Sequence, residues 1–149
     1  MIDQLIQLAA AGIGSLGFAL LFNLRGRRLF WASLGGVISW GVYLVVMAFW
    51  PHEAGSYLLA ALLLTVYAEI MARIQKAPVT VYLVAGTIPL IPGASLYRTM
   101  SYAVSANWRM AMNNGVTTLL LAAAISGGIL ACMVLWNIFE MLMRKNSRS

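Results

Sequence analysis

The most constraining feature of the sequence is an apolar segment, residues 78–100, that is interrupted in its middle. Pro89, Pro92 and Gly93 fall within five residues of one another. A proline lacks the backbone N–H and its ring clashes with the carbonyl four residues earlier, and glycine adds backbone freedom, so we expect no continuous helix here. Within a bilayer, freed backbone groups persist only where protein or a water-filled cavity satisfies them. The break therefore predicts a buried, polar-lined place inside a membrane protein, and we expect the function to be located there.

The composition of the chain indicates its class. The 149 residues are 62% hydrophobic and 9% charged, and the mean hydropathy is +0.84. A soluble domain is closer to one half apolar and one quarter charged. Because one small core cannot hide this excess, we predict an all-α polytopic membrane protein in which residues 1–149 form a single membrane domain.

The apolar runs predict about five transmembrane helices, of which the fourth is interrupted at the Pro-x-x-Pro-Gly break. The expected spans are residues 4–22, 29–50, 55–75, 79–110 (broken near 89–93) and 115–141. The ten residues from Val79 to Ile88 would extend about 15 Å as a helix, half of a hydrocarbon core of about 30 Å. If Val79 lies at one surface, the break lies near the middle of the bilayer.

Pairs of small residues, four positions apart, lie on one face of a helix. Ala10 and Gly14 form such a pair in the first span, and Gly127 and Gly128 each follow an alanine by four residues in the last. Such faces favour close helix packing in membranes. For Ala10 and Gly14, contact between a substrate and the exposed backbone is the alternative interpretation.

The formal net charge is +6, and the basic residues lie at the ends of apolar runs. No basic stripe with interleaved aromatic residues is present, so we expect no nucleic-acid binding. Three segments between or after the spans are basic: Arg25, Arg27 and Arg28; Arg73 and Lys76; and Arg144, Lys145 and Arg148. With five spans these segments fall on one side, which the positive-inside rule makes cytoplasmic. We therefore expect the N-terminus outside and the C-terminus in the cytoplasm, with a retained first helix rather than a signal peptide.

The break is also the candidate substrate site. A second half-helix beginning at Gly93 would present unpaired backbone N–H groups and a positive dipole end, which suit a carboxylate. Nearby hydroxyl groups, a tyrosine ring and an arginine could complete such a site. The candidate substrate-binding residues are Thr87, Pro89, Pro92, Gly93, Ser95, Tyr97, Arg98 and Thr99. The alternative is a proline kink that only shapes the helix bundle.

Other ionisable residues give weaker signals. Glu69 and Arg73 are four residues apart and share a helical face, which indicates an interfacial ion pair or part of a proton or substrate path. Only four acidic residues, one histidine and one cysteine are present, and they do not cluster at catalytic or metal-binding spacing. We therefore expect no enzymatic activity, no metal site and no cofactor.

The run from Ile88 to Gly93, with Tyr97 and Met100 beyond it, resembles the signature of the threonine/serine exporter (ThrE) family. The matching motif positions are Pro89, Pro92, Gly93 and Tyr97. The resemblance implies a multi-pass protein of the bacterial inner membrane that exports small polar acids. Family members are associated with threonine and serine, and the split form with dicarboxylates such as succinate.

Over nearly its full length the chain resembles the small membrane subunit of the split form, which implies a second membrane subunit resembling YjjP as its partner. Inverted repeats commonly enclose the substrate in secondary transporters. Because five is an odd number of spans, the partner should insert with the reverse orientation, whereas a homo-oligomer would have parallel subunits. The alternative function is a structural or accessory membrane protein without its own transport site.

Overall fold

The computed structural model describes residues 2–146, and all of their side chains except those of residues 140 and 143–146. The described chain is all-α and contains no strand. The elements are α1 (Ile2–Leu21), α2 (Arg27–Phe49), α3 (Glu53–Gln75), α4 (Val79–Thr87), the short 3₁₀ helix η1 (Ile88–Leu90), α5 (Gly93–Val104) and α6 (Trp108–Asn146). Four described helices are long and apolar enough to cross a membrane, and a fifth span results if α4, η1 and α5 count as one bent span. The predicted class, an all-α polytopic membrane protein, is confirmed.

Small residues bring the helices of the bundle together. Ser15 of α1 and Gly36 of α2 are buried against each other, and a Cβ atom added at Gly36 would collide with the Ser15 side chain. The close contact of α1 therefore uses Ala11 and Ser15 rather than the expected face of Ala10 and Gly14. Nothing lies within 4 Å of a Cβ atom added at Gly14. The sequence pattern correctly indicated that α1 packs closely through small residues, but the face that packs is the one next to the predicted face.

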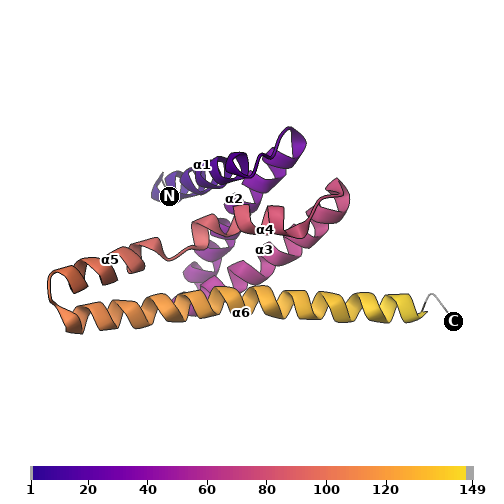
Figure 1. Cartoon of the computed structure of the whole chain (residues 1–149). Helices are drawn as coiled ribbons and strands as arrows, with labels where there is room; N and C mark the ends of the chain where they lie inside the picture. The colour runs from indigo at the N-terminus through magenta and orange to yellow at the C-terminus, as the bar shows by residue number, and fades with distance from the viewer. Residues whose placement is uncertain (1, 147–149) are drawn as a thin grey trace.

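α4 is the central element of the bundle. The hydroxyl of Ser39 on α2 donates a hydrogen bond of 2.8 Å to the carbonyl oxygen of Gly86 on α4. A Cβ atom at Gly86 would collide with Leu64 of α3, so α4 lies tightly between α2 and α3 (Figure 1). α4 is therefore enclosed by neighbouring helices up to the point where η1 follows it.

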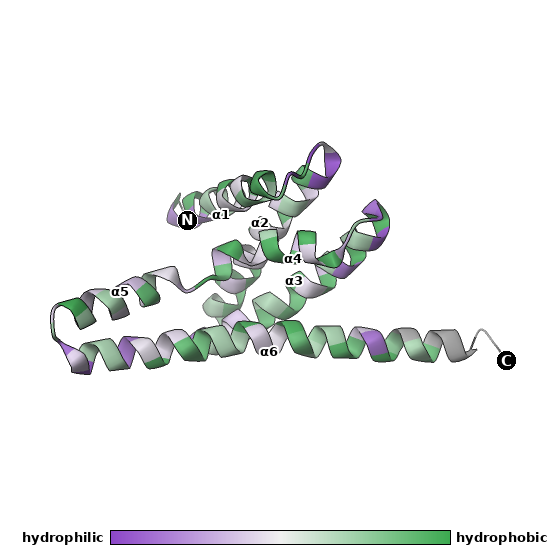
Figure 2. Cartoon of the chain, viewed as in Figure 1, coloured by the Kyte–Doolittle hydropathy of each residue, from purple (hydrophilic) through white to green (hydrophobic). Residues whose placement is uncertain are grey.

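The two ends of the bundle differ in charge. A guanidinium nitrogen of Arg28 donates to the carbonyl oxygen of Gln75 at 3.3 Å, which places the loop after α1 and the loop after α3 at the same end. Both loops are hydrophilic, as Figure 2 shows. At the opposite end His52 caps α3, where its Nδ1 atom accepts from the Gly55 amide at 3.1 Å. His52 therefore acts as a helix cap.

The chain breaks where the two prolines predict. α4 and η1 are bent by 54° relative to α5, with Ile91 extended and Pro92 preceding the first turn of α5. α5 then packs along the first part of α6, and the two form an arm that projects from the bundle (Figure 1). We call α5 and residues 108–120 the arm, and α1–α4 with residues 121–139 the bundle.

The boundaries of the arm differ from those that we expected. α5 ends at Val104 rather than near residue 110, and α6 begins at Trp108 rather than at 115. The reason is local: Ala106 adopts a φ of 56°, and the Asn107 side chain accepts from the Met110 amide at 3.4 Å. An asparagine N-cap can start a helix in this way. As a result α6 has 39 residues and a length of about 58 Å, well beyond a bilayer core.

Candidate functional site

The break presents backbone donors at the start of α5. The Gly93 amide donates to the Ile91 carbonyl at 2.7 Å, and the Leu96 amide donates to the Pro92 carbonyl at 3.0 Å. No side chain caps this helix end, and the amides of Ala94 and Ser95 have no acceptor among the described residues. Two N–H groups at a positive helix end are suited to binding one carboxylate.

The three hydroxyl groups named as candidates do not converge on these amides. Thr87 donates to the carbonyl three residues before it at 2.9 Å. The Ser95 hydroxyl lies 2.7 Å from that of Thr118 on α6, and Thr99 donates to the Ser95 carbonyl at 2.8 Å. Ser95 thus joins the two helices of the arm, which sequence reasoning did not anticipate, whereas the hydrogen bond of Thr99 lies within α5.

Tyr97 and Arg98 lie on exposed faces of α5. The Tyr97 side chain is 74% exposed, and no acidic side chain among the described residues pairs with Arg98. α5 has no buried residue at all. The start of α5 is therefore exposed in the chain by itself, and the expected buried, polar-lined place is not formed around it by the described residues.

A cavity of about 280 Å³ lies beside the first half of the break. Its lining residues come from α1, α2 and η1: Gln7, Ala10, Ala11, Gly14, Trp40, Ile88 and Pro89. The indole N–H of Trp40 donates to the side-chain oxygen of Gln7 at 3.2 Å, which places a polar pair in a largely apolar cavity. Pro89 is thus brought together with Ala10 and Gly14, the small-residue face of α1.

Gln7 and Trp40 were missed by the sequence argument. Gln7 precedes Ala10 and Gly14 by three and seven residues, so helical spacing alone places all three on one face. That spacing was the available signal. Trp40 could not be found in this way, because its position opposite Gln7 depends on how α1 and α2 pack.

The Glu69–Arg73 pair lies at the basic end of the bundle. The two side chains are 3.5 Å apart, with Glu69 14% and Arg73 52% exposed. The Arg73 guanidinium also stands 4.8 Å from the centroid of the Trp136 ring on α6. This arrangement connects α3 to α6 at a helix end, far from the break, and has the geometry of an interfacial pair.

The fold, with its four long apolar helices and one bent pair, defines a multi-pass helical membrane protein. The family model of the threonine/serine exporter, ThrE, matches residues 7–135 of the chain. Because this match covers most of the chain, including the break and the arm, the chain belongs to the threonine/serine exporter family. No solved structure matches it.

Proposed function

We propose that this chain is one membrane subunit of a secondary exporter for small polar acids, either threonine and serine or a dicarboxylate such as succinate. The observation that carries the proposal is the uncapped start of α5, where the Ala94 and Ser95 amides have no acceptor among the described residues. These donors suit the carboxylate that all of these compounds share. Arg98, three residues further along α5, supplies a positive charge on the same short helix.

The export is of the secondary type. The sequence contains no glycine-rich phosphate loop, so the chain has no recognisable site for ATP. A broken helix whose half-helix end faces an anionic group is a recurrent element of secondary transporters. The break in this chain has that form, with η1 on one side and the start of α5 on the other.

The site is completed by a second membrane subunit. Large apolar side chains on α5 are exposed, among them Leu96, Met100 and Val104. The same helix carries Arg98, and a cation within a bilayer is stable only beside a partner, a polar cavity or the interface. A second subunit resembling YjjP, with its own Pro/Gly break and the reverse orientation, would cover this face and enclose the site.

We further propose that the chain lies in the bacterial inner membrane with its N-terminus outside and its C-terminus in the cytoplasm. The shared location of the first two basic loops, joined through Arg28 and Gln75, supports this orientation. Reporter fusions at residue 2 and residue 149 test it. They should report opposite compartments, and reporters in one compartment would show an even number of crossings.

The direct test of function is reconstitution in liposomes loaded with threonine, serine or succinate. We expect little efflux from the purified chain alone and saturable efflux when the second subunit is added. Saturable efflux without any partner would contradict the two-subunit assembly. If a stable complex of both subunits exports none of the three compounds, the exporter assignment is wrong and an accessory role is favoured.

A further inference from the structure

The loop between α1 and α2 has a fixed conformation. Asn23 adopts a φ of 57° after the last turn of α1, and its amide donates to the Leu20 carbonyl at 2.8 Å. The Leu24 amide reaches the Ala19 carbonyl at 3.1 Å, and the Leu24 side chain is buried in the bundle. This is a Schellman motif with its apolar anchor, which fixes where the chain leaves the helix. The arginines that follow are therefore held at defined backbone positions.

A polar cavity of about 550 Å³ lies at this loop. It is lined by Asn23, Leu24, Arg25, Arg27 and Arg28 and by Gln75 from the end of α3. The hydrogen bond from Arg28 to the Gln75 carbonyl, 3.3 Å long, holds the two walls together. Arg25 and Arg27 have no hydrogen-bond acceptor among the described residues.

No acid among the described residues balances the positive charge of this cavity. Among the described residues one ion pair is found, between Glu69 and Arg73, and no described acid pairs with Arg25, Arg27 or Arg28. The first turn of α2 contains two of these arginines and no acid, and no side chain caps it. Cations at a helix N-terminus oppose the helix dipole, whereas a bound anion would satisfy both the dipole and the guanidinium groups.

We propose that this basic cavity binds the carboxylate of the exported compound at the end of the bundle away from the arm, before the compound reaches the break (Figure 1). Arginine binds a carboxylate through two parallel hydrogen bonds, and Arg25 and Arg27 provide two such forks. The identity of the ligand as exported compound rests on the proposed function, and the cytoplasmic location of the cavity rests on the proposed orientation. The binding itself can be measured without transport.

The experiment measures succinate and threonine binding to the full-length chain in phosphatidylcholine nanodiscs by titration calorimetry. The informative variant is Arg27→Lys, which keeps the charge that sets membrane orientation but removes the planar fork. We expect saturable binding that this variant weakens by roughly tenfold or more, as for a lost charge-assisted hydrogen bond. The matched control is Arg109→Lys on the arm, which should bind like the unmodified chain.

The competing ligand is the phosphate of an anionic lipid. Repeating the titration in phosphatidylglycerol nanodiscs, with bound lipids counted by native mass spectrometry, separates the two. Retained succinate or threonine binding supports the proposal. The proposal is overturned if neither carboxylate binds in phosphatidylcholine nanodiscs, or if Arg27→Lys and Arg109→Lys weaken binding equally. It is also overturned if the cavity retains phosphatidylglycerol and excludes the carboxylates. If Arg27→Lys exports like the unmodified chain, the role of this cavity is rejected and the exporter assignment stands. If the chain binds the carboxylates in this cavity but the complete complex does not export them, the exporter assignment is rejected and the binding site stands.

Discussion

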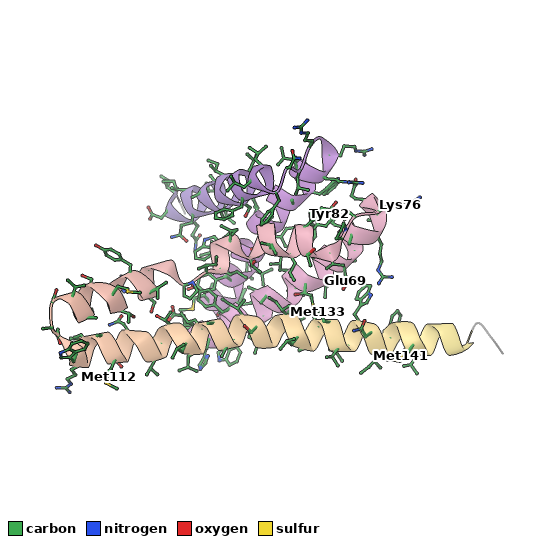
Figure 3. All side chains as sticks on the ribbon, in the orientation of Figure 1. Glu69, Lys76, Tyr82, Met112, Met133 and Met141 are labelled. Carbon is green, nitrogen blue, oxygen red and sulfur yellow. The ribbon has the colours of Figure 1, made fainter. Side chains whose placement is uncertain are left out.

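Residues 121–139 of α6 pack against α3, whereas residues 108–120 of the same helix pack against α5 and leave much of their surface open. Figure 3 shows the contrast for two methionines: Met133 lies beside α3, and Met112 lies out on the arm. Met133 is partly buried against the core, while the Met112 side chain is 71% exposed. The same helix is therefore packed against the bundle in one part and largely exposed on the arm in the other.

The difference shows which part of the molecule is closed by its own contacts. In the bundle, glycine and alanine positions are filled by neighbouring helices, as at Gly86 and Gly128. In the arm, Gly93 has open space around it, and α5 buries no residue. The contacts of the bundle thus close it within the chain, whereas the start of α5 and Arg98 stay open on the arm.

The largest effect on stability should come from Gly128→Ala. A Cβ atom at Gly128 would collide with the Leu58 carbonyl oxygen and would lie 3.2 Å from the Ala61 Cβ atom, so α6 must move away from α3. Overpacking of this kind costs about 1–3 kcal/mol. Thermal unfolding of the purified chain, followed by circular dichroism in detergent, should show a lowered Tm.

The neighbouring glycine provides a matched control for that substitution. Nothing lies within 4 Å of a Cβ atom at Gly127, and alanine is the better helix former, so Gly127→Ala should leave the Tm unchanged or raise it. If both variants lower the Tm equally, the close α3–α6 contact does not distinguish the bundle from the arm.

The double substitution Pro89→Ala, Pro92→Ala should produce the largest loss of export. Without the two prolines the helix can continue from α4 into α5, which removes the unpaired amides and turns the arm from its bent position. Export by cells that also express the second subunit should be lost, although the protein still inserts. Pro51→Ala, in the loop before α3, is the control and should export normally. Normal export by the double variant would reduce the break to a packing feature.

The break and the membrane class were predictable from sequence because both depend on local chemistry. Two prolines so close together disfavour a continuous helix through local chemistry, and the apolar excess requires lipid. The turn before α6 was missed although its signal is also local. Asn107 caps the helix through its side chain, whereas Asn113 and Asn114, which fall between the expected spans 79–110 and 115–141, lie inside α6.

The composition of the site was less predictable because it depends on contacts between distant segments. The Gln7–Trp40 pair joins residues 33 positions apart, and Ser95 binds Thr118 across 23 positions. The role of Gly93 also differs from the one expected. Among the described residues the one glycine with a positive φ is Gly26, so the break does not need the backbone freedom of Gly93.

A moderate effect is expected for Arg98→Gln. If the Arg98 guanidinium pairs with the substrate carboxylate or with an acid of the second subunit, export should fall by about tenfold, as for one lost charge-assisted hydrogen bond. The Tm of the chain alone should not change, because Arg98 is exposed and pairs with no described acid. Arg109→Gln at the tip of the arm is the control. Equal export by the two variants would show that position 98 has no special role in the arm.

The smallest structural effect should come from Gly93→Ala, which makes it the sharpest test of the arm. The Gly93 backbone is helical, and a Cβ atom there meets nothing within 4 Å. The substitution should leave the Tm unchanged or raise it, because alanine favours the helix and can add at most about 1 kcal/mol to the free energy of unfolding. Export should nevertheless fall, because a methyl group at the start of α5 would stand between the Ala94 and Ser95 amides and whatever approaches them. Gly127→Ala adds the same methyl group at an open position of the bundle; it should leave the Tm unchanged or raise it, and it should not change export. A Gly93→Ala chain that folds and exports like the unmodified protein would mean that neither substrate nor partner comes close to the start of α5, and the arm would then be open surface rather than half of a site.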